Sequence, residues 1–245
     1  MPLFRLSERI EFPPAWLARS DGLLCIGGDL SSERLLLAYK KGIFPWFSAN
    51  EPLLWWSPDP RLVLFPSAIK VSRSLKKKIN KNLFRLTLDQ AFEQTINACA
   101  RSRQASAEGT WLVDEMIDAY IKLHRLGHAH SIEVWLKNRL VGGLYGICLG
   151  GSFFGESMFS IETDASKIAL VGLACHLTRH GFDLIDCQVT TGHLVTMGAI
   201  EISRETFLEK ITISIARKMA PETWNPDLFH YPLPFKEEKN EYPLP

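Results

Sequence analysis

The hydrophobic pattern of this chain changes its period several times between residues 86 and 220. Apolar residues three and four positions apart, such as Phe92, Ile96 and Cys99, predict amphipathic helices, whereas alternating or continuous apolar runs bounded by glycine predict strands. This part of the chain therefore indicates a regular mixture of helices and strands. The expected elements are helices at 87–102 and 112–127, strands at 131–136, 140–149 and 152–158, a helix at 164–181, a strand at 184–189, and helices at 191–198 and 203–219.

The first part of the chain lacks such a pattern and is rich in proline and tryptophan. Within it, residues 29–42 predict one short helix, with Ser31 or Ser32 as its N-cap and Gly42 at its end. The tryptophans of this region either pack a loop-rich domain or line an apolar or base-stacking pocket. Both interpretations remain open at this stage.

The order of the elements after residue 86 is the one expected of a GNAT-type acyltransferase domain. We therefore expect an α+β fold, with a GNAT-like mixed sheet flanked by helices and a smaller loop-rich N-terminal domain. GNAT-type domains usually bind coenzyme A on a Q/R-x-x-G-x-G/A loop that opens a helix. The nearest match, Arg139 to Leu144, fails at its last position and lies at the start of a strand, so no cofactor is expected. The expected domains are a small Trp/Pro-rich domain at 1–66, a basic helix or linker at 67–85, a GNAT-like catalytic domain at 86–225 and a tail at 226–245.

Composition and charge narrow the classes of partner. The chain has 245 residues, of which 46% are hydrophobic and 22% charged, as in an ordinary soluble globular protein. Because 28 basic side chains nearly cancel 27 acidic ones, a nucleic-acid partner would need a local basic patch. The five cysteines form no C-x-x-C pair, and no apolar run reaches the roughly 18 residues of a membrane span. We expect a cytoplasmic protein that is not anchored in a membrane.

A local basic patch is found at residues 70–85, which contain lysine and arginine but no acidic residue. If this segment is helical, Arg73, Lys77 and Lys81 lie on one face, because they are spaced by four residues. A run of charges usually forms a solvated helix face. In a nearly neutral chain, however, this run also favours a strip that binds phosphates.

Two polar residues interrupt the apolar run LIDCQV at 184–189. In a strand, Asp186 and Gln188 share one face, while Cys187 faces the other way. The carboxylate and the amide form either a catalytic pair or a buried Asp that backbone donors satisfy, with Gln188 hydrogen-bonded nearby. Glu156 interrupts an apolar strand end in a similar way, either as a salt-bridge partner or as a site residue. Sequence alone leaves these alternatives open.

Histidines cluster near residue 127 without predicting a metal site. His124 and His128 would share a face only on an unbroken helix, and Gly127 ends that helix. No third carboxylate or cysteine ligand lies close by in the sequence, so we expect no metal.

Several blocks of residues together resemble one known family. LCIGGDLSSERLLLAYKKGIFPWFS, LLWWSPDPR, EGTWL, LGHAHSIEVW, LVGGLYG, GESMFS followed by ASKIAL, and LIDCQV are similar to the bacterial leucyl/phenylalanyl-tRNA–protein transferase family. The match runs in order from about residue 12 to residue 224 and is much more specific than any single motif. The resemblance implies transfer of Leu or Phe, with Met as an open alternative, from aminoacyl-tRNA to the α-amino group of proteins that begin with Arg or Lys. Such products are marked for degradation by the N-end rule.

The resemblance also implies roles for particular residues. It assigns the catalytic relay to Asp186 and Gln188, and contact with the acceptor protein to Glu156. In this relay the Asp186 carboxylate would fix the Gln188 side-chain amide, whose oxygen would accept a hydrogen bond from the attacking amine. Phosphate contacts of the tRNA fall on the three basic positions described above, while a further family contact matches Asn80, which carries no charge. The pocket for the donor amino acid and the terminal adenosine corresponds to Trp46, Trp111, Leu144, Phe154 and Met158.

Leu144 departs from a methionine that one member of the family has at this position. This substitution conserves volume, yet it could change the preference among Leu, Phe and Met. Two rival functions remain: a GNAT-like acyltransferase that uses acetyl-CoA, and an RNA-binding module without catalytic activity. The sequence does not fix the oligomeric state or the order in which substrates bind.

Overall fold

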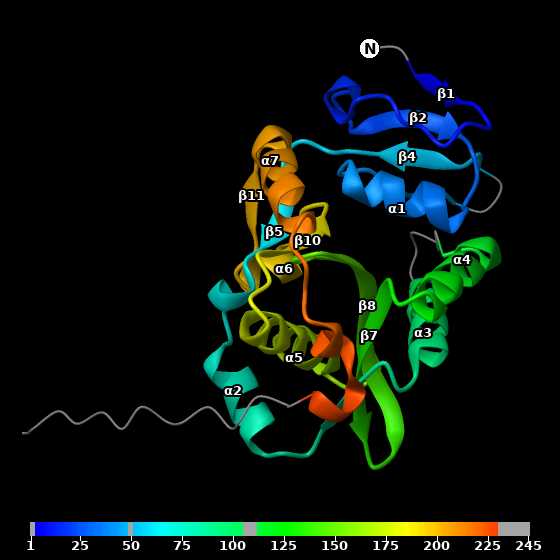
Figure 1. The fold of residues 1–245 in the computed structure, drawn as a ribbon. Coiled ribbons are helices and arrows are strands. Elements are labelled where there is room, and N and C mark those ends of the chain that lie inside the picture. The colour runs from blue at the N-terminus through cyan, green and yellow to red at the C-terminus, as the bar shows by residue number, and fades with distance from the viewer. Residues whose placement is uncertain (1–2, 49–50, 105–111, 230–245) are drawn as a thin grey trace, which may run out of the picture.

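Two mixed β-sheets with helices on both sides of the larger sheet make up the described chain (Figure 1). The computed structural model describes residues 3–48, 51–104 and 112–229. The helices are α1 (Ser32–Lys40), α2 (Arg73–Asn80), α3 (Phe92–Gln104), α4 (Asp114–Arg125), α5 (Ala165–Arg179), α6 (Gly192–Thr196) and α7 (Arg204–Ile215). The strands are β1 (Phe4–Leu6), β2 (Leu23–Gly27), β3 (Phe44–Pro45), β4 (Leu54–Trp56), β5 (Arg61–Leu64), β6 (Arg85–Leu88), β7 (Ala129–Leu136), β8 (Arg139–Leu149), β9 (Ser152–Ser160), β10 (Leu184–Gln188) and β11 (Ile200–Ile202).

The smaller sheet has the strand order β1-β2-β4-β3, and the larger sheet has the order β11-β5-β10-β9-β8-β7-β6. In the larger sheet, β10 runs parallel to β9, while its other neighbour β5 is antiparallel. The sheet continues through antiparallel pairs from β9 to β6. This mixed architecture agrees with the α+β class expected from the sequence.

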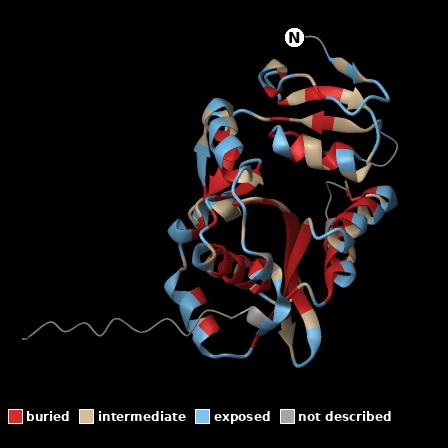
Figure 2. Cartoon of the chain, in the orientation of Figure 1, coloured by how far each residue is buried: buried red, intermediate tan, exposed pale blue. Residues whose placement is uncertain are grey.

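Helices cover opposite faces of the larger sheet, with α5 on one side and α3 and α4 on the other (Figure 1). Buried apolar residues of α5, including Ile168 and Leu173, belong to one core cluster, and those of α3 and α4, including Ile96 and Met116, belong to another. Figure 2 shows buried residues along α5 and the central strands. The second of these clusters also takes in Trp55 of the smaller sheet, so the two sheets are packed against a shared core.

Helix ends follow the capping signals of the sequence. The Ser31 hydroxyl accepts a hydrogen bond from the Arg34 backbone N–H, which confirms one of the two predicted N-caps, and Gly42 lies beyond the helix with a φ of 69°. The basic segment forms α2, which begins after Ser72 and buries Leu75 and Ile79. The prediction of a helix at 87–102 was wrong at its start, because residues 87–88 belong to β6 and α3 spans Phe92–Gln104. The other predicted helices are shorter than expected by a few residues at their ends.

The sequence prediction lacked the four strands of the smaller sheet and three short strands of the larger sheet. The three in the larger sheet are β5, β6 and β11, each three or four residues long. β5 hydrogen-bonds to β10 in the larger sheet, although it falls inside the range 1–66 expected to form the N-terminal domain. The division into domains stays a prediction. Among the described helices, none is long and apolar enough to span a membrane.

Candidate functional site

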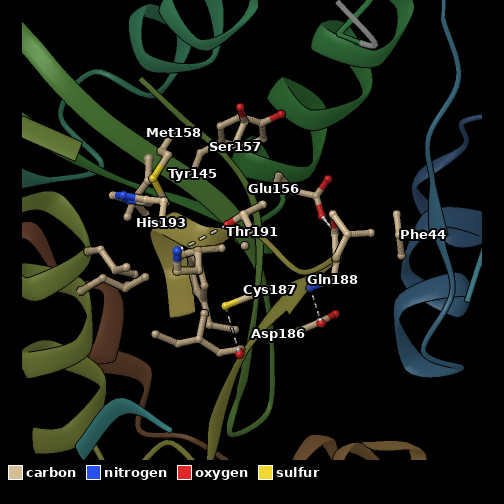
Figure 3. A pocket seen from close by; sticks show the side chains of 18 of the residues that line it. Phe44, Tyr145, Glu156, Ser157, Met158, Asp186, Cys187, Gln188, Thr191 and His193 are labelled. Carbon is tan, nitrogen blue, oxygen red and sulfur yellow. Dashed lines mark hydrogen bonds between the residues drawn. The ribbon is translucent and has the colours of Figure 1, made fainter. Parts of the chain in front are cut away.

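A cavity of about 320 Å³ lies where β8, β9 and β10 meet α5, α6 and β3 with the residue after it (Figure 3). Its wall is largely apolar, because the inward side chains of the central strands and α5 are aliphatic or aromatic. Glu156, Asp186 and Gln188 join this wall at one end, and the polar residues Ser157, Thr191 and His193 also line the cavity. The apolar part of the wall includes Trp46, Leu144, Phe153, Met158, Leu170 and Leu173.

Asp186 forms a buried ion pair with Arg61, the first residue of β5. The Arg61 Nε donates to Asp186 Oδ1 at 2.8 Å, and Nη2 donates to Oδ2 at 2.6 Å. The side chains of Arg61 and Asp186 are only 1% and 0% exposed. The Arg61 guanidinium carbon lies 4.8 Å from the Phe44 ring centroid and 4.5 Å from the Phe207 ring centroid. This two-pronged geometry between aromatic faces fixes both side chains.

Gln188 ends β10 in a left-handed backbone conformation. Its φ is 63°, and the pairing of β10 with β5 shifts register between residues 186 and 188. The backbone N–H of Gln188 donates to Asp186 Oδ1 at 2.9 Å. A non-glycine residue in this region of φ and ψ costs on the order of 1 kcal/mol or more, which a hydrogen bond to a buried carboxylate can offset.

The Gln188 side chain lies against Glu156 on the neighbouring strand. Gln188 Nε2 donates to Glu156 Oε1 at 2.7 Å, and the Tyr120 hydroxyl donates to Glu156 Oε2 at 2.8 Å. The hydroxyls of Tyr39 and Tyr120 are hydrogen-bonded to each other. A chain of hydrogen bonds therefore links α1, α4, β9 and β10. Figure 3 shows Gln188 between Glu156 and Asp186.

Burial dominates the electrostatics of Glu156. It raises the pKa of this carboxyl to about 7, against hydrogen bonds from Tyr120 and Tyr39 that lower it, and the charge of Asp186 adds to the rise. Burial, followed by the charge of Glu156, raises the pKa of Tyr39 and of Tyr120 well above the ordinary value. Both phenols thus remain protonated donors at neutral pH.

The structure brings together most of the residues predicted for the amino-acid pocket. Trp46, Leu144 and Met158 line the cavity. Phe154 does not belong to its lining: it is fully buried in the opposite core cluster, where its ring centroid lies 5.3 Å from that of Tyr39. Side chains alternate along β9, so the preceding residue, Phe153, faces the cavity instead. Trp111 lies outside the described residues.

Sequence reasoning predicted that the Asp186 carboxylate fixes the Gln188 side-chain amide. In the structure this carboxylate binds the Gln188 backbone N–H, and Glu156 binds the side-chain amide. The alternative of a buried Asp satisfied by backbone donors therefore describes one of its contacts. Side chains alternate at the start of β10, since Leu184 lies in one core cluster and Ile185 in the other. The register shift between Asp186 and Gln188 interrupts this alternation at the polar residues.

Sequence reasoning missed three polar residues of the site: Arg61, Tyr39 and Tyr120. Arg61 could have been noticed, because it begins the apolar run RLVL. The two tyrosines occupy apolar helix faces at ordinary spacing, so no pattern distinguishes them from core residues.

The three predicted tRNA-contacting residues lie on or next to α2. Arg73, Lys77 and Lys81 are exposed, as a phosphate-binding strip requires. Lys78, on the same helix, instead donates to Asp164 Oδ2 at 2.8 Å and to the Thr163 carbonyl at 2.9 Å. It therefore anchors α2 to the start of α5.

His124 and Cys187 have surroundings that favour a role in packing over a role in chemistry. His124 stacks on Phe92, with ring centroids 4.2 Å apart, and its Nδ1 lies 2.7 Å from the Ala129 carbonyl oxygen. Burial raises the pKa of the Cys187 thiol, followed by the charge of Asp186, which disfavours a thiolate. Within the described ranges, no group of three or more His, Cys, Asp or Glu residues could hold a metal ion.

Comparison with known proteins identifies the relatives of this chain. A family model described as "Leucyl/phenylalanyl-tRNA protein transferase" matches residues 63–212, and a model of the N-terminal domain of the same family matches residues 28–59. Proteins named leucyl/phenylalanyl-tRNA--protein transferase are 61% identical in Desulforapulum autotrophicum and 58% identical in Syntrophobacter fumaroxidans. Each alignment covers 91% of this chain, together with 98% and 96% of the respective relative.

A solved structure of L-PGS from Bacillus licheniformis matches 69% of this chain and 53% of its own chain, with 10% identity and a TM-score of 0.38. This likeness is too low to support an argument about fold. The sequence matches, in contrast, cover nearly the whole chain at high identity. They place it among the aminoacyltransferases. More narrowly, the chain belongs to the leucyl/phenylalanyl-tRNA protein transferase family.

The raised pKa of Glu156 makes folding stability depend on pH. Because the folded chain holds this proton more tightly than the unfolded chain, the stabilisation is fully present below the ordinary pKa of 4.5 and is lost as pH rises to about 7. Glu156→Gln removes this titration. We expect its unfolding free energy, relative to the wild type, to rise by on the order of 2–3 kcal/mol between pH 5 and pH 8.

Denaturant unfolding at a series of pH values measures this difference. Glu133, whose pKa burial also raises to about 7, titrates in both proteins and cancels from the comparison. A difference between Glu156→Gln and the wild type that stays constant with pH would contradict the assignment.

Proposed function

We propose that this chain transfers Leu or Phe from aminoacyl-tRNA to the α-amino group of proteins that begin with Arg or Lys. The observation that carries the proposal is Gln188, which two buried carboxylates hold at the polar end of an apolar cavity. This arrangement supplies one fixed polar group beside a pocket for an apolar side chain. The products of this reaction are the substrates of N-end-rule degradation expected from the sequence.

The reaction forms a C–N bond and breaks the ester C–O bond between the amino acid and the terminal ribose. The attacking amine must lose a proton, and the ribose oxygen must gain one. Because an α-amino group has a pKa near 7.7–8.0, a modest hydrogen-bond acceptor is sufficient to prepare it. The Nε2 of Gln188 is engaged by Glu156, which leaves the Oε1 of Gln188 as the acceptor for the amine.

Glu156 is the proposed partner of the acceptor's N-terminal Arg or Lys side chain. Its carboxyl accepts hydrogen bonds from Tyr120 and from Gln188, and it lies at the polar end of the cavity. A bound cation would favour the ionised carboxylate and lower its pKa from about 7. Acceptor binding and ionisation of Glu156 are thus coupled.

The apolar cavity is the proposed site of the donor side chain. Leu144, Phe153 and Met158 form part of its wall, and Trp46, which is 42% exposed, lies at its edge. A lining of this kind favours Leu and Phe over polar amino acids through burial of apolar surface. Trp46 is the proposed stacking partner of the terminal adenosine.

The basic face of α2 is the proposed contact with tRNA phosphates. Arg73, Lys77 and Lys81 are exposed there, while Leu75 and Ile79 anchor the opposite face in the core. Phosphate contacts carry little sequence information, so the terminal CCA and the attached amino acid dominate selection. The GNAT-like character of the larger sheet, supported by its element order, belongs to the same proposal. These substrates agree with the cytoplasmic location expected from the sequence.

Incubation with labelled Leu-tRNA and a peptide that begins with Arg tests the activity. We expect label on the peptide, because the amine is held beside the ester, and no label on the same peptide with an acetylated N-terminus. Ribonuclease should abolish transfer, and acetyl-CoA should not replace the tRNA. An unlabelled Arg peptide, in the presence of an active control enzyme, would exclude the proposal.

Charge reversal on α2 tests the tRNA contact. Lys77→Glu should weaken tRNA binding by about tenfold at low salt, with a smaller effect at high salt, because counterion release drives phosphate binding. Lys122→Glu, at an exposed position of α4, is the matched control and should bind normally. Filter binding over a salt series measures both. Equal affinities of the two variants at low salt would rule out the strip.

A further inference from the structure

Burial of the Arg61–Asp186 ion pair carries a large desolvation cost, and the proposed chemistry does not explain why the pair is present. Both side chains are almost completely buried, and removing two charges from water costs several kcal/mol per ion before their attraction is counted. An apolar pair of similar volume would often stabilise such a core equally well. Because this ion pair contacts Gln188, we expect it to serve the reaction and not only the stability of the fold.

This contact involves the Gln188 backbone. Gln188 has a left-handed φ at the end of β10, and from this turn its side chain reaches Glu156 on β9. The Gln188 N–H finds its partner in Asp186 Oδ1, the same oxygen that accepts from Arg61 Nε. Arg61 thus orients the carboxylate, and the carboxylate holds the strained turn.

We propose that Arg61 is a positioning residue for the transfer reaction: it locks Asp186 so that Asp186 fixes the Gln188 backbone, and Asp186 takes no proton from the attacking amine. This inference rests on the proposed function. Three N–H donors, two from Arg61 and one from Gln188, already surround the Asp186 carboxylate. Both carboxylate oxygens are thus already occupied by N–H donors that hold the side chain in place.

The aromatic surroundings support the same role. The Phe44 ring comes from the smaller sheet and the Phe207 ring from α7, and both lie within 5 Å of the guanidinium carbon. Arg61 therefore contacts the smaller sheet and α7 through these rings, and it binds the Asp186 carboxylate on β10. The direction of the Gln188 side chain depends on all of them.

A pair of neutral double variants separates positioning from proton transfer. In Arg61→Gln with Asp186→Asn, two amides replace the ion pair, and an Asn oxygen can still accept from the Gln188 N–H. In Arg61→Gln with Asp186→Ala, that acceptor is lost. We expect kcat of the Asn variant to exceed that of the Ala variant by about tenfold or more, with similar KM for Leu-tRNA, because the Ala variant has no side-chain acceptor for the Gln188 N–H.

Thermal unfolding checks that both double variants are folded. Equal kcat values in folded Asn and Ala variants would overturn the inference, because neither can accept a proton at position 186. Wild-type protein without transfer activity would instead refute the proposed function itself.

Arg61→Lys provides a second test if the neutral variants do not fold. Lysine keeps the positive charge but cannot donate two parallel hydrogen bonds. We expect its kcat to fall by about tenfold while KM for Leu-tRNA stays within about twofold. A folded Arg61→Lys protein with wild-type kcat would contradict the positioning role.

Discussion

The geometry of the site depends on the buried ion pair between Arg61 and Asp186. It joins β5 to β10, and it lies between aromatic rings from the smaller sheet and from α7. Because both charges are withdrawn from water, each is stable only with the other in place. The same carboxylate holds the Gln188 backbone in its left-handed turn. The pairing of Arg61 with Asp186 thereby helps to fix the direction of the Gln188 side chain.

Environment gives the two carboxylates of the site different properties. Asp186 is paired with a guanidinium, whereas Glu156 receives hydrogen bonds from neutral groups, Tyr120 and Gln188. Burial accordingly raises the pKa of Glu156 to about 7. Glu156, whose pKa is close to neutral pH, is thus the carboxyl proposed to bind the cationic side chain of the acceptor. The other serves the architecture of the turn.

Hydrophobic periodicity predicted the long elements of the larger sheet and its helices, because each of them buries a continuous apolar face. It missed the short strand β5, whose stability comes from pairing with β10. Asp186 and Gln188 were predicted to share a face, but the partner of Asp186 lies 125 residues away in the sequence, beyond the reach of local patterns. Asp186 was expected to bind the Gln188 side-chain amide, but it binds the backbone N–H, and Glu156 binds the side-chain amide. Local patterns did not predict the turn that produces these contacts. Phe154 was assigned by resemblance, and strand alternation places Phe153 at the cavity instead.

Hydrogen exchange of the Gln188 backbone amide, followed by NMR, tests most directly whether the clamped carboxylate holds the turn. The account predicts exchange as slow as that of core amides in β10, because the N–H donates to a fully buried oxygen. The amide of Thr190, two residues further on and exposed, provides the fast reference. A Gln188 amide that exchanges as fast as that of Thr190 would contradict the account.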